Sequence, residues 1–520
     1  MTPLNRRAAR ILLTLLALGI AWFGLVPAAS AVITDPEDYF PGFNTGAGQS
    51  AFWNLREGAY NTGIGLFSLY TLLDGSYNTG VGAGALLFTT ADRNTAIGAA
   101  ALLSNTTGGN NTAIGISSLG NNVTGSGNTA VGSLALGFNT GDENTATGFE
   151  ALMSNTEGGG NTADGTAALF SNVIGDDNTA TGFEALLNNT EGSGNTAVGS
   201  MALSSNTVAA GNTAIGYGAL QGNMTGENNT ATGNSALARN EEGTWNTAMG
   251  SEALASSTAD GNTAMGFRAL SNTTSGGANT AIGSNALLNN TLGGNNVGIG
   301  RDTLGSNTTG NSNTAVGYGA GYTITTGTAN VALGAFAGKG ITTAYNVICI
   351  GDGVLGADIN NSTWIGNIWG VVPKSGNTAP VVISENGQLG IAPSSERFKK
   401  DIATMKEASG AILSLRPVTF HYKADAKQRP QFGLIAEEVA KVNPALVVPD
   451  KDGKPYTVRY DVVNTMLLNE FLKEHRKVEE LESALRAVNA RLAEQDAKIQ
   501  RVSAEVQLSK SERKTAMNER

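Results

Sequence analysis

A short repeat constrains the fold of this chain more than any other feature. The motif Asn-Thr-Ala-x-Gly, or a close variant, recurs between residues 44 and 351 at intervals of 16 or 17 residues. One unit cannot bury its own apolar residues, so neighbouring units must stack on one another. The repeats begin at Asn44, Asn61, Asn78, Asn94, Asn111, Asn128, Asn144, Asn161, Asn178, Asn195, Asn212, Asn229, Asn246, Asn262, Asn279, Asn296, Asn313, Asn330 and Asn346.

The layout of each unit predicts a β-solenoid over residues 32–351. Two short apolar patches, such as Ala96-Ile97 and Ala101-Leu102-Leu103, are separated by glycine and followed by an Asn/Gly-rich turn. We expect two short strands in each coil, glycine at corners that need positive φ, and asparagine ladders along the stack. A helical array is excluded, because glycine recurs inside every candidate helix.

Composition and charge exclude several classes of function. The chain has a net charge of −10 and its repeats are acidic, which disfavours a nucleic acid ligand because phosphate binding needs the opposite sign. Cys349 is the only cysteine, so no internal disulfide can form. His421 and His475 are the only histidines, and without a Cys/His cluster we expect no zinc site and no cofactor.

The N-terminus is typical of an export signal, which we place at residues 1–31. Arg6, Arg7 and Arg10 precede the apolar run 11–26, and Ala29-Ser30-Ala31 provides a small-x-small cleavage site. The alternative is an uncleaved membrane anchor, since the apolar run is only slightly short for a span. The sequence therefore predicts a secreted or cell-surface protein.

Two local patterns in the repeats are better explained by the repeat itself. Gly82-Ala83-Gly84 looks like a phosphate loop but has no helix after it, and Gly175-Asp176-Asp177 does not have the spacing of a calcium-binding repeat. After residue 351 the repeat ends, and residues 352–393 are expected to form a β neck or cap. There, 364–372 and 381–390 resemble strands, with Asn386-Gly387 as a tight turn.

The junction that follows contains the best candidate for a catalytic site. It reads Ser394-Ser395-Glu396-Arg397-Phe398-Lys399. A lysine can act as a general base for a serine only when it is neutral, which requires burial to lower its pKa. Without further information, a solvated charged segment explains the same residues.

This junction resembles the self-cleaving C-terminal intramolecular chaperones of endosialidase and other phage tailspikes, a domain also found in the myelin regulatory factor. That family opens with Ser-Asp-x-Arg-x-Lys, so the resemblance implies Ser394 and Lys399 as a catalytic dyad and Arg397 as a supporting residue. Ser395 replaces the usual aspartate. The lead-in 387–390 and the segment 432–439, with Pro444 after it, also match the family.

The resemblance implies a domain at 394–465 that forms a homotrimer, templates folding of the upstream fibre, and then cuts the chain near Ser394. The expected products are residues 32–393 and 394–520. The repeats in turn resemble the β-roll heads of trimeric autotransporter adhesins, although those heads usually have shorter units. The expected fold is an all-β repeat solenoid in a trimeric β-roll fibre, then a small α/β chaperone domain and a C-terminal coiled coil.

Short elements and a long heptad pattern are expected beyond the junction. Residues 401–415 and 434–442 are helical in spacing, 418–422 form a strand, and 447–449 pairs with 456–460 around Asp452-Gly453. A coiled coil is predicted over 466–510, and residues 511–520 are expected to be disordered. The predicted seam alternates steps of four and three through Leu467, Phe471, Glu474, Val478, Leu481, Leu485, Val488, Leu492, Gln495, Ile499, Val502 and Val506.

Three functions remain open from the sequence. The first is an exported trimeric fibre that cuts itself once as a serine autopeptidase. The second is a non-cleaving adhesin or structural fibre that keeps its tail as a trimerisation domain. The third, an enzyme acting on polysaccharide, is disfavoured because the repeats lack paired carboxylates in a constant setting and have few aromatic residues.

Overall fold

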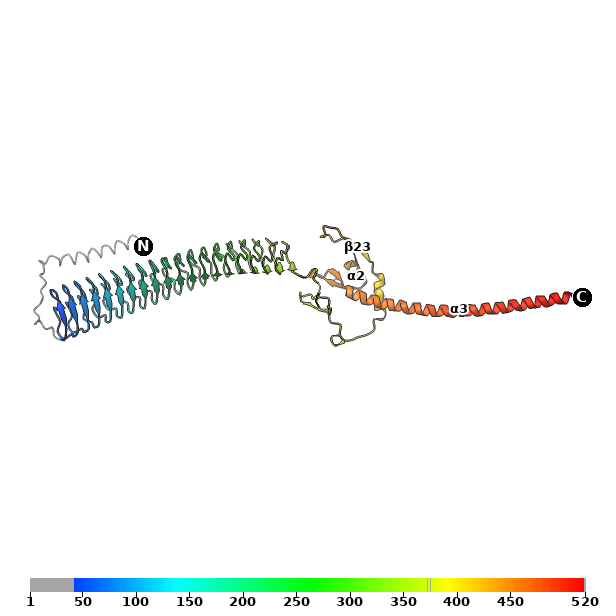
Figure 1. Ribbon diagram of the computed structural model, residues 1–520, viewed down its shortest axis with the longest axis horizontal. Coiled ribbons are helices and arrows are strands. Elements are labelled where there is room, and N and C mark those ends of the chain that lie inside the picture. The colour runs from blue at the N-terminus through cyan, green and yellow to red at the C-terminus, as the bar shows by residue number, and fades with distance from the viewer. Residues whose placement is uncertain (1–41, 372, 375, 519–520) are drawn as a thin grey trace. The chain divides into compact units, whose positions relative to one another are not determined.

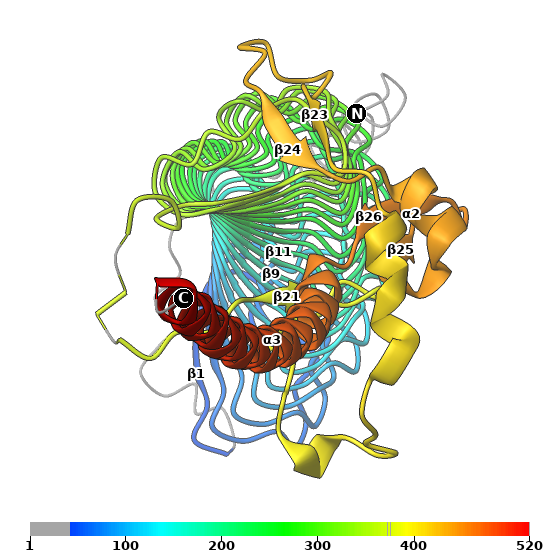
Figure 2. The ribbon, with the colours of Figure 1, turned by 90° about the vertical axis from the view of Figure 1, so that its right-hand side faces the viewer.

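The computed structural model describes residues 42–371, 373–374 and 376–518, and the chain divides into two compact units between residues 372 and 373. The predicted export signal lies outside the described residues. The first unit is a β-solenoid of about 19 turns, which follow one another in a single row (Figure 1). Viewed from one end, each turn lies behind the next (Figure 2).

One three-residue strand per turn forms the single sheet of the solenoid, and all neighbours are parallel and in register, as in the pairing of Thr196 with Thr213. The strands are β1 Thr45–Ala47, β2 Thr62–Ile64, β3 Thr79–Val81, β4 Thr95–Ile97, β5 Thr112–Ile114, β6 Thr129–Val131, β7 Thr145–Thr147, β8 Thr162–Asp164, β9 Thr179–Thr181, β10 Thr196–Val198, β11 Thr213–Ile215, β12 Thr230–Thr232, β13 Thr247–Met249, β14 Thr263–Met265, β15 Thr280–Ile282, β16 Val297–Ile299, β17 Thr314–Val316, β18 Val331–Leu333, β19 Ile348–Ile350 and β20 Thr363–Ile365.

The prediction of two strands per coil is wrong, because the second apolar patch is not a strand. In the patch and just before it, left-handed residues alternate with ordinary ones: Ala100 has φ 58° and Leu102 has φ 50°. The patch still bonds to the next turn, since the Leu102 amide donates to the Ser118 carbonyl at 3.0 Å and the Ser104 amide to that of Gly120 at 3.0 Å. With this alternation, the backbone N–H and C=O groups of the patch form hydrogen bonds to the next turn although the residues do not have the extended φ of a strand.

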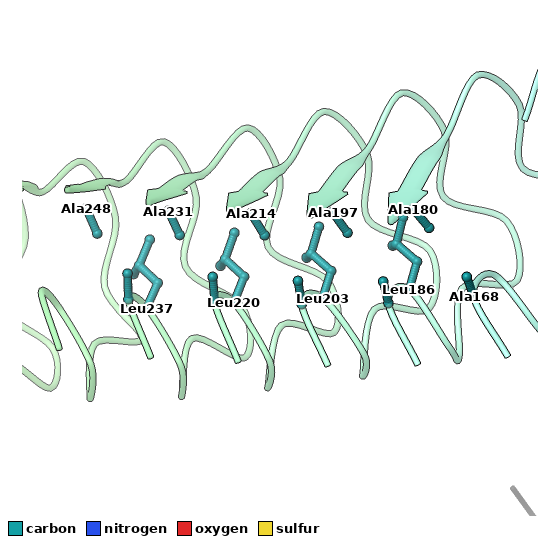
Figure 3. Packing of buried hydrophobic residues seen from close by; sticks show 14 of the residues in the cluster. Ala168, Ala180, Leu186, Ala197, Leu203, Ala214, Leu220, Ala231, Leu237 and Ala248 are labelled. Atoms are coloured by element: carbon teal, nitrogen blue, oxygen red, sulfur yellow. The ribbon is translucent and has the colours of Figure 1, made fainter. Parts of the chain in front are cut away.

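Small residues of the strands and leucines of the second patch form the core. The two rows face each other along the solenoid, as Ala197 and Ala214 do toward Leu203 and Leu220 (Figure 3). These side chains are fully buried. At each corner a glycine is required: Gly98 has φ 140°, and a Cβ there would lie 2.3 Å from the Gly115 carbonyl oxygen.

The predicted asparagine ladders are present at two positions. At the first residue of the repeat, Asn212 Oδ1 accepts from the Asn229 backbone amide at 3.0 Å, and Asn212 Nδ2 donates to the Gly226 carbonyl at 2.9 Å. A second ladder runs through residues such as Asn206 and Asn223, whose side chains are 3.0 Å apart. Both sets are buried, so hydrogen bonding offsets the cost of removing these amides from water.

The first ladder ends one residue away from its predicted position. Ile348 pairs with Val331, so buried Val347 takes the place of the asparagine, and Asn346 lies before it at positive φ. The last repeat therefore starts at Val347 rather than at Asn346. Side chains of the final turns also hold the end of the stack, where the Asp358 carboxylate accepts hydrogen bonds from Thr342, Thr343 and Ala344.

The C-terminal unit is a set of short elements followed by one long helix. Its hairpins and helices confirm the predicted strand near 418, the helix near 436 and the hairpin around Gly453. The helix predicted over 401–415 is shorter in the structure and is a 3₁₀ helix, Lys406–Ser414. Its elements are β21 Val382–Ile383, β22 Leu389–Gly390, η1 Glu396–Phe398, η2 Lys406–Ser414, β23 Val418–Phe420, β24 Gln431–Gly433, α2 Ala436–Val442, η3 Pro444–Leu446, β25 Val447–Pro449, β26 Pro455–Val458 and α3 Tyr460–Asn518.

A small core joins these elements. Val439, Leu446, Val458 and Met466 are buried and bring α2, η3, β26 and the start of α3 together. Helix α3 starts six residues before the predicted coiled coil and continues to Asn518, through most of the segment expected to be disordered. The core is small, so much of this unit remains open to solvent.

Candidate functional site

The candidate dyad residues lie on either side of the short 3₁₀ helix η1. Ser395 precedes this helix and its carbonyl accepts from the Phe398 amide at 3.0 Å. Lys399 follows the helix, and its amide donates to the Glu396 carbonyl at 2.9 Å. The local fold of the motif is therefore one tight turn between Ser394 and Lys399.

In this single chain the motif is exposed to solvent. Ser394, Arg397 and Lys399 are all exposed, and no hydrogen bond joins the Ser394 hydroxyl to the Lys399 amine among the described residues. The Arg397 guanidinium lies 4.7 Å from the centroid of the Phe398 ring, an arrangement typical of a cation–π contact. Surroundings that would bury the lysine are not provided by the described part of one chain.

Downstream of the motif, η2 packs on α3 through polar side chains that the sequence did not reveal. Ser409 is fully buried, and its hydroxyl donates to Glu470 and accepts from Asn469 Nδ2 at 2.6 Å. Lys473 Nζ lies 2.9 Å from Glu470 Oε1 and 3.0 Å from Glu407 Oε2. We call these five residues the η2–α3 clasp. Ser409 and Glu470 are 61 positions apart, so their contact leaves no local pattern in the sequence.

Two further contacts connect the elements of this unit. Arg416 holds Glu438 of α2 through two hydrogen bonds, Nε to Oε2 at 3.1 Å and Nη2 to Oε1 at 2.5 Å. The arginine lowers the pKa of the Glu438 carboxyl, mainly through these hydrogen bonds. The Tyr460 hydroxyl, at the start of α3, accepts from the Leu434 amide at 2.9 Å. Both α2 and α3 are therefore fixed to the segment after the motif.

The predicted seam of α3 is not covered by the described residues of the C-terminal unit. Its apolar side chains are roughly half exposed, which leaves an apolar stripe, interrupted at Glu474 and Gln495, on a helix of 59 residues. Such a stripe is typical of a helix that packs on other helices. The exposed members are Leu467, Phe471, Val478, Leu481, Leu485, Val488, Leu492, Ile499, Val502 and Val506.

The sheet of the solenoid carries a second open apolar surface, which we call the outer stripe. It is formed by the last residue of successive strands, which points away from the core. Polar residues interrupt it at Thr147, Asp164, Thr181 and Thr232. The apolar stretches on either side of these residues are typical of an interaction site. Its exposed apolar members are Ile64, Ile97, Ile114, Val131, Val198, Ile215, Met249, Met265, Ile282, Ile299, Leu333, Ile350 and Ile365.

Aromatic residues gather near the start of the solenoid, where the sequence indicated few. Phe67, Tyr70 and Phe88 line a groove of about 610 Å³ together with leucine and alanine side chains. Gly84 also lines this groove and adds no side chain to it. The walls are almost wholly apolar, so the groove offers few polar groups that would orient a sugar.

The acidic turn that resembled a calcium site in the sequence has a structural role in the solenoid. In the turn 175–177, Asp176 Oδ1 accepts from the Gly159 amide at 2.8 Å, so it links two turns of the solenoid. Across the described ranges, no group of three or more His, Cys, Asp or Glu side chains is arranged to hold a metal ion. None of the helices within those ranges is long and apolar enough to cross a membrane.

Comparison with known proteins gives one match. No curated protein and no solved structure matches the chain. Residues 394–448 match the model of the family described as the chaperone of endosialidase, and the match starts at Ser394 itself. The matched segment spans η1 to β25 and includes the motif, η2 and α2. Behind a parallel β-solenoid, this chain therefore carries a segment that matches the chaperone-of-endosialidase family model.

Proposed function

We propose that this protein is an exported trimeric fibre whose C-terminal unit drives assembly and folding and then cuts the chain beside Ser394. The observation that carries the proposal is the family match, which begins at Ser394 and follows a solenoid of about 19 turns. Export is inferred from the signal-like sequence of residues 1–31.

Two open apolar surfaces support a trimer. The seam of α3 and the outer stripe both run along the chain, and each needs a partner to leave water. Copies of the same chain present both surfaces in the same order, so parallel association covers them together. The family resemblance favours three chains. Parallel strand pairing in a long solenoid is slow, so a pre-assembled helical end aids folding by holding the chains together.

The cleavage chemistry follows from the dyad. A neutral Lys399 amine takes the proton from the Ser394 hydroxyl, and Oγ attacks the carbonyl carbon of Pro393. The C–N bond to Ser394 breaks, the proton passes to the leaving nitrogen, and an ester remains between Pro393 and Ser394 Oγ. Water hydrolyses this ester. Because both groups belong to one chain, the effective concentration is high, and one turnover is enough.

The alternative function is a non-cleaving adhesin or structural fibre that keeps its tail as a trimerisation domain. Two observations favour it: Ser395 stands where the family has aspartate, and both dyad side chains are exposed in the single chain. In our proposal, the assembled trimer provides the burial that a neutral lysine requires.

Expression of four forms of the full chain distinguishes these functions. We expect the wild type and Ser395→Ala to give two fragments with a new N-terminus at Ser394, and Ser394→Ala and Lys399→Met to remain intact. Ser395→Ala is the matched control, because it removes the neighbouring hydroxyl. Intact-mass spectrometry identifies the ends of the fragments. A wild type that stays whole as a folded trimer supports the alternative, and identical cleavage of all four forms excludes the dyad.

A further inference from the structure

The η2–α3 clasp stands out because Ser409 is the one fully buried polar side chain in the described part of the C-terminal unit. A buried hydroxyl is costly unless its hydrogen bonds are made. Here it donates to Glu470 and accepts from Asn469 Nδ2, which also donates to the Lys406 carbonyl at 3.0 Å. This placement of η2 on α3 satisfies all of these groups.

The clasp also contains charge that is partly removed from water. The Glu470 side chain is 13% exposed and that of Lys473 is 22% exposed, and Lys473 reaches Glu407 at the start of η2. Hydrogen bonds from Ser409 and Lys473 lower the pKa of Glu470, and the bond to Glu470 raises the pKa of Lys473. The ion pair and these hydrogen bonds together hold η2 against α3.

The clasp lies beside the open seam of α3. Met466, Asn469, Glu470 and Lys473 follow the spacing of one helical face and are covered by η2 and the small core. The seam residues Leu467, Phe471 and Glu474 come one position later, so their face is rotated by about 100°. A helix packed on the seam would therefore lie next to η2.

The clasp is also close in sequence to the motif. Ser409 follows Lys399 by ten residues, and η2 begins at Lys406. The seven Cα-to-Cα steps from Lys399 to Lys406 span at most about 25 Å when fully extended. Fixing η2 on α3 thus limits where Lys399 can go.

We propose that the η2–α3 clasp couples assembly of the α3 helices to cleavage at Ser394. By seating η2 beside the seam, the clasp brings the segment that carries Lys399 to the place where partner chains enclose it. Ser409 and Glu470 are positioning residues in this scheme and do not touch the reacting atoms. The inference depends on the proposed self-cleavage and adds how it is controlled.

The test compares cleavage rates of matched variants of the full chain after refolding. Ser409→Ala is paired with Ser414→Ala, an exposed serine of the same 3₁₀ helix, and Glu470→Gln with Glu480→Gln, an exposed carboxylate further along α3. Loss of a hydrogen bond to a charged group should slow cleavage roughly tenfold. Both controls should keep the wild-type rate, and every variant should keep the wild-type trimer mass.

A double-mutant cycle separates positioning from general destabilisation. Ser409→Ala combined with Glu470→Gln should be no slower than the slower single variant, because both changes break the same contact. Rates that multiply, or a Ser409→Ala protein that cleaves at the wild-type rate, would overturn the inference. So would a loss of trimer mass that accounts for the whole decrease in rate.

Amide exchange in the Ser394→Ala background tests whether the clasp holds η2 in place, because this variant is expected to remain uncleaved. In that trimer, Ser409→Ala should speed exchange over residues 400–414, whereas Ser414→Ala should not. If the wild type does not cleave, self-cleavage is refuted and the coupling with it. If the wild type cleaves but exchange over η2 is unchanged by Ser409→Ala, the clasp alone is refuted.

Discussion

Buried asparagine is an uncommon core residue, and this solenoid carries it at two positions in most of its turns. In the first ladder a side chain such as that of Asn212 accepts from a backbone amide and donates to a backbone carbonyl, so the ladder replaces contacts that a longer strand would make. Where the sequence changes, the packing compensates. Gly321 replaces a core leucine, and a Cβ there would lie 3.1 Å from Cδ1 of Ile324, which fills the space in place of a ladder asparagine.

Asn212→Ala should weaken the solenoid locally. It leaves the Asn229 amide buried without a partner and removes one of the two hydrogen bonds to the Gly226 carbonyl, which still accepts from Asn223 Nδ2, at a cost of about 1–3 kcal/mol. Because contacts in a solenoid are confined to neighbouring turns, faster amide exchange should be limited to the turns around residues 212–246. Asn234→Ala, at an exposed position, serves as the control. Equal exchange in both variants would contradict a structural role for the ladder.

At the scale of elements, the strands could be predicted and the second patch could not. Thr-Ala-x repeats at a constant register, and this alone indicates stacked parallel strands. In contrast, nothing in Ala-Leu-Leu reveals that Leu102 has positive φ, a conformation that costs about 1–2 kcal/mol per leucine outside a folded context. Leucine is stabilised there by burial and by hydrogen bonds to the next turn, which are properties of the stack.

The candidate site also has a part that could be predicted from the sequence and a part that could not. Ser394, Arg397 and Lys399 lie within six residues and are recognisable from sequence spacing. Ser409 and Glu470 lie 61 residues apart and meet only because η2 folds back on α3. Long-range polar contacts of this kind carry no periodicity, so sequence reasoning has no means to pair them.

The end of the solenoid should depend on pH through Asp358. Burial raises the pKa of this carboxyl, but hydrogen bonds from Thr342, Thr343 and Ala344 outweigh that and hold it well below its usual range. Its contribution is therefore complete above the ordinary aspartate pKa near 4 and declines as pH falls below that value.

Asp358→Ala tests this dependence. At neutral pH, the amides of Thr342, Thr343 and Ala344 should exchange severalfold faster in the variant than in the wild type, because each donates to the carboxylate. When both proteins are compared at the same pH, the difference should narrow below about pH 4. Asp352→Ala, an exposed carboxylate in the same turn, should leave these amides unchanged. A difference that is independent of pH would refute the assignment.

At the scale of the molecule, our proposal places the means of assembly after the part of the chain that it helps to fold. Within the C-terminal unit Ser394 is exposed, the core is small and the seam of α3 is open. Each unit thus presents an apolar surface that its own described residues do not bury. In the proposed order, helices associate first, the solenoids align next, and the enclosed motif reacts last.

This order predicts that cleavage depends on chain concentration. When denatured wild type is refolded, the early cleavage rate per chain should rise with concentration, because enclosure of Lys399 requires partner chains. Leu481→Ser with Leu485→Ser removes two seam side chains, each contributing about 1.5–3 kcal/mol when buried, and should abolish both trimer and cleavage. Glu482→Ser with Arg486→Ser changes neighbouring positions off the seam and should preserve both. A half-time that stays constant with dilution, measured together with the mass of the species present, would mean that one chain is sufficient and that assembly is not the trigger.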